Sequence, residues 1–151
     1  MTKLDKSDIK YLVIHCSDSD WGCEAEINRW HKDRGWDGIG YHFVICNGFP
    51  DSIHRHQFNP DWDGLIQNTQ RTRNGVYMKG IHVQGKNSVS IGICLIGVRQ
   101  FTFAQVDSLV TVIKSLRIEF PDAEVVGHYE LDPGRRTCPN FDVKKFLKLT
   151  S

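Results

Sequence analysis

The stretch SIGICLI at residues 90–96 is a nearly continuous apolar run. Such a run is typical of a central strand that is buried on both faces of a sheet. Further strands are predicted at residues 9–14, where the sequence is IKYLVI, and at residues 41–46, where it is YHFVIC. A shorter apolar segment at residues 124–127 predicts another strand. These segments together indicate one central sheet.

Helical patterns alternate with these strands. A helix is predicted over residues 24–34, because Gly35 suits the cap at its C-terminal end. The sequence TFAQ at residues 102–105 fits a capping box that begins a long helix, and Pro121 ends that helix. Residues 142–149 predict a last helix. Strands that alternate with helices indicate an α/β fold with a central sheet.

The segment between the second strand and residue 79 follows no clear period. The dipeptide Asn47-Gly48 is a strong hairpin signal, and residues 51–55 are the predicted return strand. Turn signals then follow one another over residues 56–79. A stretch of this length without its own pattern is unusual in a compact domain. It predicts either an ordered excursion near a functional face or a mobile flap.

The composition indicates one folded domain and excludes several classes of protein. With 151 residues, 40% of them hydrophobic, the chain has the size of a single globular domain, which we expect to span residues 1–151. A net charge of +1 lacks the positive surface of a dedicated nucleic-acid binder. The chain has no long uncharged apolar window, and residues 1–10 carry charges of both signs. We therefore expect no nucleic-acid partner, no membrane insertion and no signal peptide, so that the protein is cytoplasmic on synthesis.

The five cysteines favour unpaired thiols over a disulfide framework, because their number is odd and their spacing wide. Cys16, Cys46 and Cys94 lie within or beside apolar runs, where a thiol packs as a small hydrophobic group. Cys138 differs, because it lies in the polar turn RRTCPN at residues 135–140. From its position alone it is either a bystander or a functional thiol.

His15 and His128 each follow an apolar strand at its C-terminal end. In open α/β sheets, ligands gather at that edge. Cys138 follows in a polar loop close enough to fold back. Two imidazoles and one thiolate make a zinc site with one position open for water. The sequence does not show whether the three side chains converge, so the alternative that they bind no common metal ion remains open.

A zinc ion with these three ligands keeps a net charge of +1, lowers the pKa of water towards ~7 and polarises a carbonyl group. This chemistry suits hydrolysis of an amide. The reaction also needs a polar group beside the attacking water and a donor for the oxyanion.

Several short motifs occur in a fixed order along nearly the whole chain. They are IHCS at 14–17, WH at 30–31, GW at 35–36, GIGYHF at 38–43, HVQGKN at 82–87, SIGI at 90–93, GH at 127–128 and CP at 138–139. Each motif alone is weak, but their order and spacing within one small domain are specific. Through them the chain resembles the zinc-dependent N-acetylmuramoyl-L-alanine amidases, which include phage amidase-type lysozymes and peptidoglycan recognition proteins.

The resemblance implies an α/β fold with a mixed central β-sheet flanked by helices. It implies one Zn²⁺ per chain, held by His15, His128 and Cys138. It also implies cleavage of the amide between the lactyl group of N-acetylmuramic acid and the L-alanine that begins the stem peptide. Tyr41 aligns with the family's active-site tyrosine, beside the hydrolytic water. His82 aligns with a histidine that lines the groove and is assigned to substrate binding.

Two further assignments follow from the same resemblance. Asn87 is assigned to substrate binding, with the organisation of a turn as its alternative role. Arg136 stands where the phage lysozymes have a lysine, two residues before the cysteine ligand, and we expect it to stabilise the oxyanion. The alternative is a solvated arginine beside Arg135. The excursion at residues 56–79 is longer than expected for the family, and it bears on the shape of one groove wall.

The resemblance favours a monomeric phage or prophage endolysin that acts on bacterial peptidoglycan or its muropeptides after release to the periplasm. Two alternatives stay open. One is a non-catalytic peptidoglycan-binding module, as in recognition proteins that have lost zinc ligands. The other is an amidase that also regulates phage RNA polymerase by protein contact. The presence of all three ligand residues together with Tyr41 favours catalysis over binding alone.

Overall fold

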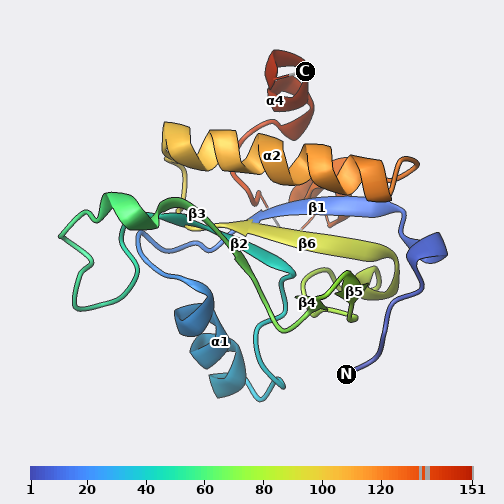
Figure 1. Ribbon diagram of the computed structural model, residues 1–151, viewed down its shortest axis with the longest axis horizontal. Helices are drawn as coiled ribbons and strands as arrows, with labels where there is room; N and C mark the ends of the chain where they lie inside the picture. Colours follow the sequence, from blue (N-terminus) through green and yellow to red (C-terminus); the bar gives the residue numbers. More distant parts are fainter. Residues whose placement is uncertain (133, 135–136, 151) are drawn as a thin grey trace.

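The apolar run at residues 90–96 forms the central strand of the protein. The computed structural model describes residues 1–132, 134 and 137–150. Strand β6 (Ser90–Leu95) is buried along its whole length. It lies in the middle of a five-stranded sheet with the order β3-β2-β6-β1-β7 (Figure 1). The prediction of a central strand buried on both faces is therefore confirmed.

The other four strands make the sheet mixed. Strands β1 (Tyr11–Cys16) and β2 (Phe43–Asn47) flank β6 and run parallel to it. Strand β7 (Glu124–Gly127) runs parallel to β1 at one edge. Strand β3 (Asp63–Asn68) runs antiparallel to β2 at the other edge. The predicted mixed central sheet is confirmed.

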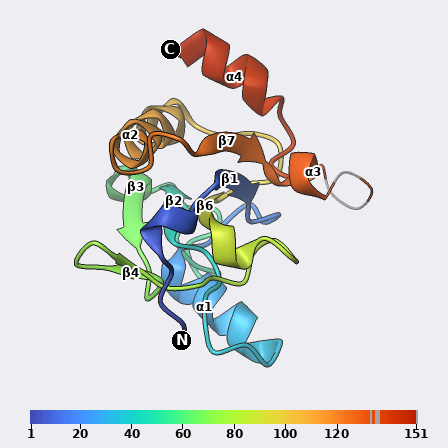
Figure 2. The same ribbon diagram turned by 90° about the vertical axis from the view of Figure 1, so that its right-hand side faces the viewer.

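Helices cover both faces of this sheet. Figures 1 and 2 show α2 (Phe103–Glu119) and α4 (Val143–Thr150) on one side and α1 (Glu24–Asp33) on the other. The predicted capping box at the start of α2 is present: the Thr102 side chain accepts from the Gln105 amide, and the Gln105 side chain accepts from the Thr102 amide. None of the helices in the described part of the chain is long and apolar enough to cross a membrane.

Short elements complete the chain. Helix α3 (His128–Leu131) follows β7 directly, and β4 (Thr72–Arg73) forms a hairpin with β5 (Val76–Tyr77). Three 3₁₀ turns lie at Lys6–Asp8, Pro60–Trp62 and Asn87–Val89. All five cysteines lie in the described part of the chain and have free thiols, as predicted.

The predicted return strand at residues 51–55 is wrong. That segment forms turns, in which the Asp51 carboxylate accepts from the backbone N–H of His54. The strand that pairs with β2 is β3, where Asn68 lies opposite Phe43. The hairpin signal at residue 47 therefore begins a long connection and not a tight turn. For the stretch at residues 56–79, the sequence left an ordered excursion and a mobile flap as alternatives. The structure shows an ordered segment, because the stretch contains β3 and the β4-β5 hairpin.

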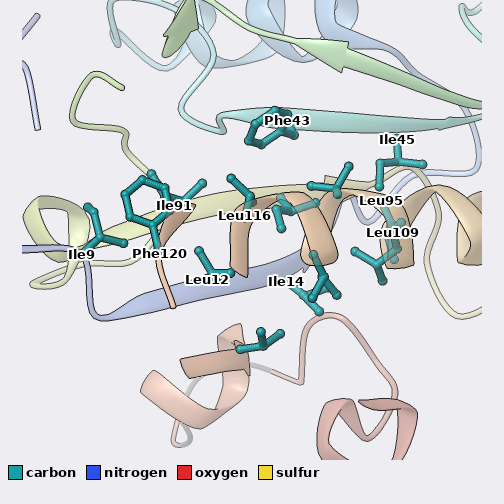
Figure 3. Packing of buried hydrophobic residues seen from close by; sticks show 14 of the residues in the cluster. Ile9, Leu12, Ile14, Phe43, Ile45, Ile91, Leu95, Leu109, Leu116 and Phe120 are labelled. Atoms are coloured by element: carbon teal, nitrogen blue, oxygen red, sulfur yellow. The ribbon is translucent and has the colours of Figure 1, made fainter. Parts of the chain in front are cut away.

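Strand alternation decides which side chains face the site. The larger core lies between the sheet and α2, and it contains Leu12 and Ile14 of β1 (Figure 3). Successive residues of a strand point to opposite faces. Val13 therefore joins a separate cluster on the other face, with Val83 and Val126. His15 is next in that alternation and lies on the same face as Val13.

Candidate active site and metal centre

Parallel pairing of β1 with β7 brings two of the predicted ligands together. In this pair Ile14 lies opposite Gly127, so the next residues, His15 and His128, emerge side by side at the same edge. Their ring centroids are 4.6 Å apart. The candidate ligand atoms of these two histidines and Cys138 all lie within 4.8 Å of one another. The convergence that the sequence left open is thus present.

Backbone hydrogen bonds hold Cys138 beside the histidines. The N–H of Tyr129 in α3 donates to the carbonyl oxygen of Cys138 over 3.0 Å. The N–H of Cys16 donates to the Sγ atom of Cys138, also over 3.0 Å. Asn140 ties the same loop to the sheet edge, because its side-chain amide donates to the carbonyl oxygen of Val98 over 2.6 Å.

These three residues fit a zinc ion by their chemistry. Zn–N and Zn–S bonds of roughly 2.0–2.3 Å allow one ion to reach donors that are this close. Both imidazoles are buried, and the thiol is half-buried. The N–H of Cys16 that donates to Sγ of Cys138 favours a thiolate, the form in which cysteine binds metals, whereas the neighbouring Cys16 thiol and burial raise the pKa of Cys138 when no metal is bound. Among the described residues, no fourth His, Cys, Asp or Glu side chain joins these three. This number of ligands is typical of a catalytic zinc site, in which the fourth position is open to water or substrate.

A pocket of about 320 Å³ opens over the three candidate ligands. Tyr41 lies in its wall, with its ring centroid 5.0 Å from that of His15. Burial raises the pKa of Tyr41 well above its usual value, so the phenol keeps its proton at neutral pH. Its ring lies beside the candidate metal site, and its side chain is hydrogen-bonded to the thiol of Cys94.

Arg34 and Trp36 form a second part of the pocket wall. The guanidinium group lies 5.4 Å from the centroid of the indole ring, at cation–π distance. Sequence reasoning missed both residues as parts of the site. The GW motif at residues 35–36 was a signal, but a tryptophan in such a motif is as easily explained by packing.

The other predicted site residues lie at different depths. His82 lines the pocket, as predicted, but it is buried beneath His15. Asn87 does not line this pocket: its side-chain oxygen accepts from the backbone N–H groups of His82 and Val83. Its alternative role as the organiser of a turn is therefore the one that the structure supports. Arg136 lies outside the described residues.

Two more buried histidines, His31 and His42, have neutral rings that accept hydrogen bonds from the main chain near the site. Nδ1 of His31 accepts from the N–H of Gly40 over 2.9 Å, and Nδ1 of His42 accepts from the N–H of Gly92 over 3.0 Å. Burial lowers the pKa of each ring to about 4. Both rings are thus held in the neutral form by donors from the main chain.

We expect the metal-free protein to lose stability as the pH falls from about 6.5 to about 4. In that range the unfolded chain binds protons at histidines that the folded state keeps neutral, so the unfolded state gains stability. For His31 and His42 the pKa of about 4 corresponds to a loss of up to about 3 kcal/mol each in the free energy of unfolding. Urea unfolding at a series of pH values, with a chelator present, measures this loss.

The variant His31→Asn provides the control for this expectation. Its side-chain oxygen can accept from Gly40 in place of Nδ1, but it does not titrate. The variant should therefore lose less stability than the natural protein over the same pH range. An identical pH dependence would contradict the assignment of the loss to this histidine.

Comparison with known proteins places these features in a family. The sequence matches the N-acetylmuramoyl-L-alanine amidase family over residues 5–141. The endolysin of Enterobacteria phage K11 is 30% identical over 154 residues, which cover 95% of this chain and 88% of that endolysin. The endolysin of Escherichia phage T7 is 31% identical over 146 residues, which cover 89% of this chain and 83% of that endolysin.

Solved structures show the same fold. The N-acetylmuramoyl-L-alanine amidase LysC from Clostridium intestinale URNW superposes with a TM-score of 0.72 at 26% identity, covering 98% of this chain and 90% of that one. The recognition protein PGRP-SA of bumblebee superposes with a TM-score of 0.69 at 22% identity, covering 98% and 84% of the two chains. The latter likeness concerns the fold alone.

Proposed function

Because this chain belongs to the N-acetylmuramoyl-L-alanine amidase family and is a peptidoglycan amidase of the endolysin type, we propose that it cleaves its substrate at one Zn²⁺ held by His15, His128 and Cys138. The bond is the amide between N-acetylmuramic acid and the L-alanine of the stem peptide. The observation that carries the proposal is the convergence of the three candidate ligand atoms within 4.8 Å beneath the pocket.

In the proposed mechanism, zinc activates the reactants, and side-chain and main-chain groups of the protein position them. When bound, zinc supplies a Lewis acid that polarises the scissile carbonyl and makes water a nucleophile near neutral pH. Tyr41 keeps its proton on Oη, because burial raises its pKa, and it orients the attacking water by hydrogen bonding. The amide of Cys16 stabilises the charge on the Cys138 sulfur throughout.

We assign the stabilisation of the oxyanion to Arg136, on the basis of the family resemblance alone. A guanidinium stays protonated at any working pH, so it acts by charge-assisted hydrogen bonds and not by proton transfer. Arg136→Ala should lower kcat by about 10²-fold, the cost of losing one such donor, while zinc stays bound. Arg136→Lys should restore much of the rate. Arg135→Ala is the matched control, and equal, near-normal rates in the two alanine variants would refute the role.

Digestion of purified bacterial peptidoglycan, followed by mass analysis of the soluble products, tests the proposed function. Stem peptides that begin at L-alanine are the expected products, and a chelator should abolish their release until zinc is restored. Release of disaccharides by glycosidic cleavage would overturn the assignment. Full activity in a metal-free preparation would overturn the zinc site while leaving the amidase assignment in place.

The oligomeric state, the compartment of action and any protein partner of the enzyme stay predictions. We propose that the enzyme is a monomer and reaches the peptidoglycan after release to the periplasm. The complete ligand set and Tyr41 support catalysis over a module that only binds muropeptides. Contact with a phage RNA polymerase also stays a prediction, which a pull-down with the purified polymerase would test.

A further inference from the structure

A continuous line of polar groups begins at Nε2 of His15 and leads away from the pocket. This nitrogen lies 2.9 Å from Nδ1 of His82. Nε2 of His82 lies 3.2 Å from Oγ of Ser90. Oγ of Ser90 lies 2.7 Å from the backbone carbonyl oxygen of Lys86. Two buried side chains thus connect a candidate metal ligand to the main chain.

The direction of every hydrogen bond in this line follows from its last member. A carbonyl oxygen only accepts, so Ser90 donates its single hydroxyl proton to Lys86. The serine oxygen then accepts, and Nε2–H of His82 is its donor. A neutral imidazole carries one ring proton, so Nδ1 of His82 accepts from Nε2–H of His15. In neutral His15 the proton therefore resides on Nε2, and Nδ1 carries the lone pair that binds a metal.

These hydrogen-bond directions require a neutral ring at His82, and the surroundings of the ring favour that form. The side chain is buried, and its ring meets those of His15 and His42 at centroid distances of 5.0 and 5.7 Å. Burial disfavours the charged form of an imidazole, and the hydrogen bonds of this ring in the described part of the chain join it to an imidazole and a hydroxyl group and not to a carboxylate.

The fold keeps the His82 ring in this line. The side-chain oxygen of Asn87 accepts from the N–H groups of His82 and Val83 over 2.9 and 2.8 Å, which fixes the backbone at this point. The ring lies against β6 at Gly92, where a Cβ atom would come within 2.8 Å of Cγ and Nδ1 of His82. A side chain at position 92 would therefore displace the ring.

We propose that His82 is a positioning residue for the metal ligand His15, and that Ser90 sets the tautomers of both rings. The inference rests on the proposed zinc site and assigns Nδ1 of His15 as the atom that binds the ion. A ligand histidine that donates its other N–H is held in orientation and becomes a stronger base. This role replaces the substrate-binding role that the sequence predicted for His82.

Long-range ¹H–¹⁵N spectra of the metal-free protein at mildly alkaline pH test the tautomers directly. The ring patterns of His15 and His82 should both show the proton on Nε2. Ser90→Ala removes the hydroxyl acceptor for His82 and should weaken the single-tautomer pattern of that ring, while the backbone of Ser90 still accepts from it. A proton on Nδ1 of either ring in the natural protein would overturn the proposal. This reading needs neither bound metal nor activity, and a variant that fails to fold does not affect it.

Zinc affinity, measured by competition with a chromogenic chelator, gives a second reading. His82→Ala should weaken binding by about 10–100-fold, the usual cost of losing such a partner. His82→Asn should restore most of the affinity, because its side-chain oxygen can accept in place of Nδ1. Ser90→Ala should weaken binding less than His82→Ala. Affinities within twofold of the natural protein in both alanine variants would overturn the proposal.

Ser108→Ala is the matched control for Ser90→Ala. Ser108 also donates its hydroxyl to a backbone carbonyl, that of Gly64, but it lies on α2 and outside the pocket. Its loss should leave zinc affinity unchanged, and thermal unfolding of each metal-free variant shows whether the fold is retained. If the natural protein bound no zinc, the proposed metal site would be wrong. The tautomer spectra would still test the proposed hydrogen bonds of His15 and His82, because they are recorded without metal.

Discussion

Replacement of Cys138 by serine is expected to remove zinc from the protein and to abolish amide hydrolysis. The substitution exchanges a thiolate for a neutral hydroxyl group at nearly constant shape, and it leaves two neutral imidazoles to hold a dication. Loss of a ligand should cost more zinc affinity than the roughly 10–100-fold that loss of an outer partner costs. Elemental analysis should find about one zinc per natural chain, the number for a single three-ligand site, and almost none in Cys138→Ser.

The control for this variant is Cys23→Ser. Cys23 is also buried, but it occupies the N-cap position of α1 and makes no side-chain capping hydrogen bond. Serine is a preferred N-cap residue, so this variant should fold, bind zinc and cleave peptidoglycan as the natural protein does. Normal zinc content in Cys138→Ser would contradict the ligand assignment, and equal losses in both variants would point to a general effect on folding.

Tyr41→Phe is expected to lower kcat by about 10²–10⁴-fold, the range for a positioned polar or acid–base group. The variant keeps the ring, which packs 5.0 Å from that of His15 in the pocket wall, and removes only the hydroxyl group. Zinc content and thermal stability should therefore change little. Steady-state digestion of soluble muropeptides, with zinc measured on the same preparation, separates an effect on turnover from loss of the ion.

Tyr77→Phe is the matched control for the tyrosine variant. Its hydroxyl donates to the carboxylate of Glu119 over 3.1 Å, within the core on the α2 side of the sheet. Its loss should cost about 1 kcal/mol of stability and leave turnover unchanged. Turnover of Tyr41→Phe within about twofold of the natural protein would show that its hydroxyl serves only packing.

Four of the five strands of the sheet, all except β3, could be predicted because each contains an apolar run that is recognised locally. The apolar residues of β6 and the capping box before α2 need no information from elsewhere in the chain. The return strand of the first hairpin could not be predicted, because Asn47-Gly48 signals a turn but not how far away the partner lies. β3 pairs with β2 only after a long connection, and its half-buried pattern is weak.

The ligand residues could be named from the sequence, but their meeting could not. His15 and His128 converge because β1 pairs with β7, a contact between the two ends of the chain that no local pattern specifies. The roles of His82 and Asn87 depended on which atoms face them. An asparagine that accepts two backbone N–H groups and one that faces a ligand look the same in a sequence.

Strand β7 borders the sheet, and among the described residues its one strand partner is β1. An ion bound by His15 at the end of β1, by His128 after β7 and by Cys138 beyond it would therefore link the last fifth of the chain to its first strand. Binding to the folded state alone adds stability by mass action, about 2.7 kcal/mol when zinc exceeds its Kd a hundredfold. Zinc would then stabilise the contact between β1 and β7 as well as take part in catalysis, and the metal-free protein would lack this stabilisation at that edge of the sheet.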